Sequence, residues 1–293
     1  MSQKGIPFDI PTTSSSSNNS QQQQQQLSTR PLRSNSIVKT PASRGAQASP
    51  RQIRILLCNP SSRESTTRAC VDTVLPTLSS NVVLVGCTAL EPAPSAVEGK
   101  FDEVMSAAVA VQGILQHASG FDAFLVASFG EHALVGMLRE ELTQPVVGIM
   151  EGGLFAARSL GRRFGIVCAG ERARVGIEDA VRGMGFGGFC VGVRGCGMGE
   201  AGREKAEVLR IAGQVAKEMV GDGADVVLLG CVGVSGLKEA IEGAVGDDVQ
   251  VVDGVVAGVH HLIGLCRMGA KTAKKGAYAS SAAARQRRGQ DWL

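Results

Sequence analysis

The sequence predicts an α/β protein made of two similar halves, each built around a parallel β-sheet with helices on both faces. Three observations predict this fold class. Short apolar segments alternate with helix-like segments, the short segments are apolar throughout rather than at every second position, and the same order of elements occurs twice. Strands that are apolar throughout are typical of parallel sheets whose two faces are both buried.

The strands and helices follow from these patterns in chain order. Strands are predicted at residues 53–58, 82–86, 123–127, 146–149, 164–167, 189–193, 226–229 and 249–252. Helix-like segments separate most of them, for example residues 101–118, 134–142, 201–220 and 237–244. The β-branched content of the short segments and the length of the others favour this assignment.

The repeat is clearest where an apolar strand runs into a small polar residue and a glycine. Residues 122–130 do so at Ser128, and residues 224–233 do so at Cys231. A repeat of this length indicates two equivalent units. Because ligands bind beyond the carboxyl ends of parallel strands, we expect Ser128 and Cys231 to face each other across a shared cleft.

Four regions follow from this organisation. Residues 1–50 are expected to be a disordered Ser/Gln-rich tail, because they cannot bury enough apolar surface to offset their ordering entropy. Residues 51–150 form the first half, completed by a helix at 255–270, and residues 151–254 form the second. Residues 271–293 are expected to be a disordered basic tail. The first region loosely resembles a mitochondrial presequence, but it lacks an amphipathic periodic stretch.

Charge and hydropathy narrow the class of partner. The formal charge of +3 arises in the tails, since residues 52–270 hold 18 Lys/Arg and 25 Asp/Glu, a net charge of −7. An acidic body is a poor match for nucleic acid, although the basic residues of 271–288 could contact RNA or acidic surfaces. No apolar stretch is long enough to span a membrane. We therefore do not expect a membrane as a partner, and because the body is acidic we do not expect nucleic acid either.

The cysteines indicate a reducing location and no metal site. No C-x-x-C spacing occurs, so neither a zinc site nor a thioredoxin-type motif is predicted. The sequence shows no secretory signal, and we therefore expect free thiols in the cytoplasm. The cysteines are Cys58, Cys70, Cys87, Cys168, Cys190, Cys196, Cys231 and Cys266.

Cys231 is the strongest candidate for a reactive group. It ends an apolar strand, and we expect the amides of Val232 and Gly233 and a following helix start to lower the pKa of its thiol, as a nucleophile or base requires. A buried structural cysteine is the alternative. Ser128 holds the matching position and could hydrogen-bond to a substrate or cap a helix.

The loops after the first strand of each half could bind a substrate. Asn59 and Ser61 offer short polar side chains near a helix start, which suits a carboxylate or an amide carbonyl, although an ordinary cap is the alternative. Cys168 and Ala169 form the corresponding loop, with little polar capacity. His132 could be a base or a ligand, but a surface histidine at a helix start is the simpler interpretation.

These segments together resemble the Asp/Glu/hydantoin racemase superfamily, and specifically its hydantoin and allantoin racemase-like branch. Their order and spacing carry the resemblance, which covers residues 52–265. It implies two Rossmann-like domains related by pseudo-twofold symmetry, with the ligand cleft between them, and a homo-oligomer. The segments are residues 54–61, 95–99, 122–130, 145–149, 161–167 and 229–233.

The resemblance also implies an isomerase of nitrogen-compound metabolism that needs no cofactor and no metal. Such a racemase moves a proton at a carbon next to a carbonyl of a small hydantoin-like or amino-acid-derived substrate. Two cysteines face the substrate, one as thiolate base and one as thiol acid. The second falls on Cys231 and the first on Ser128, so Ser128 replaces an expected catalytic cysteine. Phe129 and Gly130 are then expected to line the substrate beside Val232 and the other loop residues.

The departures from the family pattern leave several alternatives open. The chain could be a racemase with asymmetric or slow chemistry. It could instead resemble the arylmalonate decarboxylase branch, where one thiol at the position of Cys231 delivers the single proton needed after loss of CO2. It could also be a degenerate member that only binds small molecules, or act through its tails. The Thr-rich loop of the family falls on Cys168 and Ala169, which is a further departure.

Overall fold

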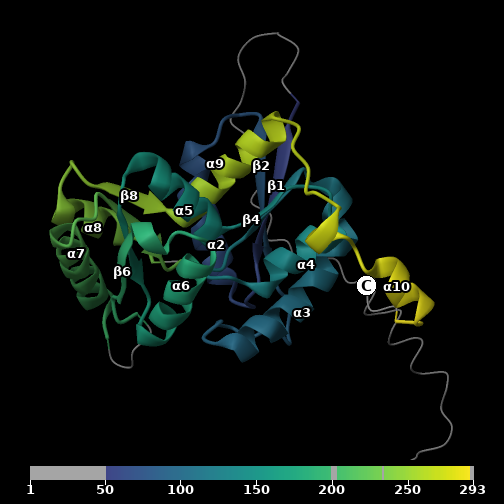
Figure 1. Ribbon diagram of the computed structural model, residues 1–293, viewed down its shortest axis with the longest axis horizontal. Coiled ribbons are helices and arrows are strands. Elements are labelled where there is room, and N and C mark those ends of the chain that lie inside the picture. Colours follow the sequence, from purple (N-terminus) through teal and green to yellow (C-terminus); the bar gives the residue numbers. More distant parts are fainter. Residues whose placement is uncertain (1–50, 199–202, 233, 291–293) are drawn as a thin grey trace, which may run out of the picture. The chain divides into compact units, whose positions relative to one another are not determined.

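The structure is a computed structural model that describes residues 51–198, 203–232 and 234–290. The tail expected at residues 1–50 lies outside the described residues, as do Gly233 and residues 291–293. Within the described ranges the chain forms two four-stranded parallel sheets flanked by helices, which confirms the predicted fold class (Figure 1).

The two sheets have the same strand order. The first runs β2-β1-β3-β4 and the second runs β6-β5-β7-β8, so the second repeats the first with every label raised by four. The first contains β1 (Ile53–Asn59), β2 (Val82–Thr88), β3 (Ala123–Val126) and β4 (Val146–Gly148). The second contains β5 (Phe164–Cys168), β6 (Cys190–Gly195), β7 (Val226–Gly230) and β8 (Gln250–Asp253).

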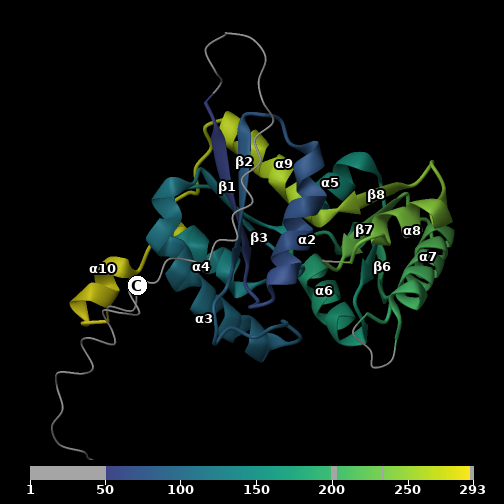
Figure 2. The same ribbon diagram turned by 180° about the vertical axis from the view of Figure 1, so that it is seen from behind.

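Helices cover both faces of each sheet. On the first sheet α2 (Glu64–Val74) and α9 (Gly254–Arg267) lie side by side (Figure 1, Figure 2), and α3 (Lys100–His117) packs with α4 (Ala133–Glu141). On the second sheet α7 (Lys205–Gly221) packs with α8 (Leu237–Val245), while α5 (Ile149–Leu160) and α6 (Glu171–Gly183) share a separate core cluster. The helix α9 therefore completes the first half although it follows the second in sequence.

The helices α5 and α9 approach each other closely because glycines lie at their contact. A Cβ added to Gly152 would lie 2.6 Å from the Cα of Gly258, which is far inside van der Waals contact. The same helix α5 contributes Ile149 to the core of the first sheet and Met150 and Leu154 to the core of the second. These buried side chains join the two halves through apolar contact.

Most expected boundaries differ from the observed ones by one or two residues, and two of the differences bear on how the halves are joined or described. Ile149 begins α5 rather than ending the preceding strand, because the apolar run continues into the helix without an intervening polar loop. The helix expected at 201–220 begins at Lys205, and residues 201–202 lie outside the described part of the chain. Among the described helices, none combines the length and apolarity that crossing a membrane requires.

The expectation of a disordered tail over residues 271–293 is corrected by the structure. Residues 271–290 fold back onto α4, and the helix α10 (Ala282–Arg287) forms there. The Nζ atom of Lys274 donates to the carbonyl oxygens of Arg139 and Glu140 at 2.6 and 2.8 Å, and Arg285 pairs with Glu141 at 2.8 Å. The basic residues thus bind the negative end of the α4 dipole and its carboxylates instead of remaining solvated.

Replacing Lys274 should weaken the fold through this contact. We expect Lys274→Met to lower the free energy of unfolding by about 1 kcal/mol, because two carbonyl oxygens at the end of α4 lose their charged donor. Urea unfolding followed by circular dichroism measures the change. The exposed neighbour Lys275 provides the matched control, and an equal loss in Lys275→Met would contradict the assignment.

Candidate active site

The predicted site residues lie at the carboxyl ends of four strands. Asn59 ends β1, Ser128 and Phe129 follow β3, Cys168 ends β5, and Cys231 follows β7. Ser61, Gly130, Ala169 and Val232 continue the same loops, and Gly233 lies outside the described residues. The structure therefore gathers the described candidates of each half at one edge of its sheet, where ligands of parallel sheets bind.

The ring of Phe129 connects the two sets of loops. A Cβ added to Gly230 would lie 3.3 Å from Cε1 of Phe129, and one added to Gly254 would lie 3.5 Å from Cε2. Phe129 packs against the core clusters of both sheets, and Val232 of the second half packs against the core of the first. The residue after Ser128 thus contacts the residue before Cys231, so the structure brings these two loops together.

Asn59 and Ser61 are buried and satisfied within their own loop. Nδ2 of Asn59 donates to the carbonyl of Arg63 and to Oγ1 of Thr67, both at 3.0 Å. Its Oδ1 accepts from the amide and the hydroxyl of Ser61 at 3.1 and 2.9 Å. Because the polar atoms of Asn59 already have partners, this pair shapes the loop after β1 and the start of α2 rather than presenting free donors.

The pKa of Cys231 is raised in the structure, whereas the sequence predicted that it would be lowered. Its side chain hydrogen-bonds to Cys196, and this bond together with burial raises the pKa of Cys231 well above its usual value. The pKa of Cys196 is lowered to about 7, chiefly by the same hydrogen bond and against the opposing effect of burial. The largest effect on the pKa of Cys231 comes from this neighbouring thiol, which the sequence analysis did not identify.

Cys196 could have been found from its place relative to the strands. It follows β6 directly, as Cys231 follows β7, and both strands pair with β5. The internal repeat matches the loop after β3 to the loop after β7, and it gives no signal for the loop after β6. Cysteines one residue beyond two strands that flank a common partner are a usable signal.

Cys168 and Ala169 support the neighbouring loop. The thiol of Cys168 is fully buried and donates to the carbonyl of Gly170 at 3.5 Å, and burial raises its pKa to about 11. The carbonyl of Ala169 accepts from the amide of Met198 at 2.8 Å. Cys168 is therefore a neutral thiol at neutral pH, and these two residues hold the loop that carries Cys196.

His132 is a buried helix cap, which corrects the interpretation of a surface histidine. Only 4% of the residue is exposed, and its Nδ1 accepts from the amide of Leu134 at 3.2 Å. Its Nε2 lies 3.1 Å from Oγ of Ser106, whose hydroxyl donates to the carbonyl of Glu103. Nε2 therefore carries the proton. Burial lowers the pKa of His132 to about 4, so its ring is neutral and serves α4 rather than catalysis.

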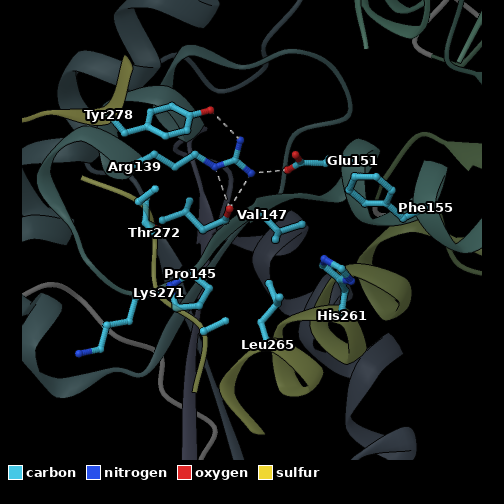
Figure 3. Close-up of a pocket in the computed structure, with 13 residues that line it drawn as sticks. Arg139, Pro145, Val147, Glu151, Phe155, His261, Leu265, Lys271, Thr272 and Tyr278 are labelled. Atoms are coloured by element: carbon cyan, nitrogen blue, oxygen red, sulfur yellow. Dashed lines mark hydrogen bonds and ion pairs between the residues drawn. The ribbon is translucent and has the colours of Figure 1, made fainter. Parts of the chain in front are cut away.

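A cavity of about 220 Å³ lies away from these residues, between α4, α5, α9 and the C-terminal segment (Figure 3). The guanidinium of Arg139 on its wall donates to the carbonyl of Val146, to Glu151 and to the hydroxyl of Tyr278. None of the predicted site residues lines this cavity. Within the described residues, no group of three or more His, Cys, Asp and Glu side chains is arranged to hold a metal ion.

Comparisons with known proteins agree with the geometry. A family model described as Asp/Glu/Hydantoin racemase matches residues 55–262. A hydantoin racemase of Rhizobium meliloti is 31% identical over 232 residues, which are 78% of this chain and 94% of the relative. The crystal structure of allantoin racemase from Pseudomonas fluorescens has a TM-score of 0.71 at 32% identity and covers 78% of this chain and 97% of its own.

A more distant likeness shows the shared fold alone. The crystal structure of arylmalonate decarboxylase has a TM-score of 0.52 at 17% identity and covers 77% of this chain and 96% of its own.

The neutral, buried state of His132 predicts a pH effect on stability. The folded-state pKa of about 4 lies below the unfolded value of 6.5, so the unfolded chain binds the extra proton first. Neutral His132 therefore makes its full contribution to the free energy of unfolding above pH 6.5, and this contribution is lost as the pH falls towards 4. Between pH 7 and pH 4.5 we expect the free energy of unfolding to fall by roughly 2 kcal/mol more in the wild-type protein than in His132→Gln. Urea titrations measure this, and exposed His117→Gln should behave as wild type.

The close approach at Gly230 predicts a strong effect of one methyl group. A Cβ there would lie 2.7 Å from Cγ2 of Ile166 and 2.9 Å from the carbonyl oxygen of Val167, so the end of β7 must move. We expect Gly230→Ala to lower the free energy of unfolding by about 2 kcal/mol or more. Gly243 on α8 has open space around its Cα, and Gly243→Ala should be neutral or stabilising. Equal melting temperatures for the two variants would refute the contact.

Proposed function

The chain belongs to the Asp/Glu/hydantoin racemase family, and we propose that it is a cofactor-independent racemase of a small hydantoin-like or amino-acid-derived substrate, with Cys231 as its reacting thiol. The contact between Phe129 and Gly230 is the observation that carries the proposal. It joins the loop of Ser128 to the loop of Cys231, as a site needs if one substrate is to be reached from both halves.

The proposed chemistry requires a proton to leave one face of a carbon and to return to the other. A thiolate at Cys231 removes the proton beside the carbonyl group, and backbone N–H groups at the strand ends stabilise the enolate. On the opposite face Ser128 offers a hydroxyl, which is a much weaker acid than a thiol and cannot serve as a base near neutral pH. We therefore expect a slow enzyme whose step at the Ser128 face limits turnover.

A decarboxylase that uses a single thiol is the second candidate function. The observation that favours it is Ser128, because after loss of CO2 only one proton must be delivered and one thiol is enough. A member that binds small molecules without turnover is the third candidate. For any of these functions we propose a cytoplasmic homo-oligomer with a small-molecule ligand, and neither nucleic acid nor a membrane as a partner.

Solvent deuterium tests the proposed function directly. Each enantiomer of a 5-substituted hydantoin and of allantoin, and an arylmalonate, is incubated in D2O with the protein, and deuterium at the stereocentre is followed by mass spectrometry. We expect exchange above the uncatalysed rate. We expect Cys231→Ala to abolish it, and Ser128→Cys to raise racemisation about tenfold or more, since a positioned acid or base contributes 10²–10⁴.

Control variants and outcomes separate the candidate functions. Cys190→Ser on β6 should react as wild type. CO2 release from the arylmalonate without exchange into hydantoins would favour the decarboxylase. Exchange in neither wild type nor Ser128→Cys, with Cys231→Ala equally silent, would refute the racemase.

A further inference from the structure

Three thiols gather at the carboxyl end of the second sheet. Cys168 ends the strand β5, and its register partners are Gly195 on β6 and Gly230 on β7. The next residues along those two strands are Cys196 and Cys231. The amide of Cys196 donates to the carbonyl of Cys168 at 2.9 Å, which ties the end of β6 to the end of β5.

Glycines before both cysteines allow this convergence. A Cβ on Gly195 would lie 2.9 Å from the Cα of Gly170. A Cβ on Gly230 would lie 2.7 Å from Cγ2 of Ile166. Because neither position carries a side chain, the two strand ends approach the central strand closely enough for Cys196 and Cys231 to hydrogen-bond through their sulfur atoms.

Most of the groups around the pair favour a negative charge on Cys196, whereas burial and the carbonyl oxygen of Ala169, 4.0 Å from its sulfur, oppose it. The guanidinium of Arg203 lies over the next residue, so that a Cβ on Gly197 would be 2.6 Å from Nη1. Arg203 and the amide of Met198 both lower the pKa of Cys196, in addition to the bond from Cys231.

The groups around Cys231 hold its proton. Cys168 and Asp253 raise the pKa of Cys231, as do its burial and its hydrogen bond to Cys196. Cys168 itself faces Cys196 and Glu171, which both raise its pKa, and it remains a neutral thiol. The two sulfurs therefore share one proton and one negative charge near neutral pH, and their first ionisation belongs to the pair.

We propose that Cys196 is a positioning residue that activates Cys231 by taking its proton within this hydrogen-bonded pair, an inference that rests on the proposed function. The thiolate of Cys196 accepts the proton of Cys231, and the thiolate formed at Cys231 removes the proton from the substrate carbon. Both sulfurs are then protonated and the negative charge lies on the enolate. A solvent-derived proton reaches the other face of the carbon, and the pair releases one proton to solvent.

The pH dependence of thiol labelling tests the pair without a substrate. Labelling of Cys231 by iodoacetamide is mapped by mass spectrometry between pH 5 and pH 10 in wild type, Cys196→Ser, Cys196→Ala and the control Cys190→Ser. We expect a wild-type midpoint near the value of about 7 given by the lowered pKa of Cys196. Both Cys196 variants should move the midpoint upwards by about one unit or more, which is roughly a tenfold slower reaction at pH 7.

The same variants also allow a kinetic test, because loss of a merely structural residue would not change the pH dependence of kcat. We expect the low-pH limb of the kcat profile for deuterium exchange to shift upwards with the labelling midpoint, while Cys190→Ser leaves both unchanged. An unmoved midpoint of Cys231 in folded Cys196→Ser would overturn the inference. If circular dichroism shows that the Cys196 variants do not fold, Arg203→Gln replaces them. Arg203→Gln should raise the pH midpoint of Cys231 labelling, whereas Arg203→Lys should keep the wild-type midpoint. Equal midpoints in these two variants would also overturn the inference.

The two proposals fail in different ways. A near-neutral midpoint that depends on Cys196, with no exchange into any substrate, would refute the racemase and leave the thiol pair standing as a reactive site. Exchange that depends on Cys231 but is indifferent to Cys196 would refute the pair alone.

Discussion

The ring of Phe129 lies against the backbone of Gly230 and Gly254, and this contact sets how the loop of Ser128 meets the loop of Cys231. It joins the aromatic residue directly after Ser128 to the end of β7, where a Cβ on Gly230 would lie only 3.3 Å from the ring. Because the ring belongs to the cores of both sheets, the apolar contacts that stabilise the halves also set the separation of the two loops. Stability and site geometry therefore depend on the same atoms.

The distribution of acid–base capacity across this contact is unequal. The side of the second half holds three thiols, of which one has its pKa lowered to about 7. The side of the first half holds the hydroxyl of Ser128 and the internally satisfied pair of Asn59 and Ser61. The described acid–base groups at the strand ends of this family member thus concentrate in the second half. The thiol pair that we propose adds acid–base capacity to the half that already holds Cys231.

The sequence revealed the architecture because its signal is local. Strands buried on both faces give apolar runs, and each predicted strand overlaps an observed one. The same reasoning misplaced Ile149, where a strand passes into α5 without a polar break. It could not find what depends on contacts distant along the chain. Ser106 buries His132, and Glu141 receives Arg285 from 144 residues away, so composition suggested exposure in both cases. Cys196 could not be predicted as a partner of Cys231, because the two residues are seen to be neighbours only once the strand order is known.

The return of α9 to the first sheet has a consequence for biosynthesis. Residues from Phe164 to Asp253 supply the whole second sheet from one continuous stretch, so its strands can pair while the chain is still emerging from the ribosome. The first sheet leaves the ribosome earlier, yet its core lacks Val255, Val259 and Leu262 until α9 is made. Its apolar face stays incomplete until α9 has been translated, which makes the earlier-synthesised half the later one to mature and the one more exposed to chaperones.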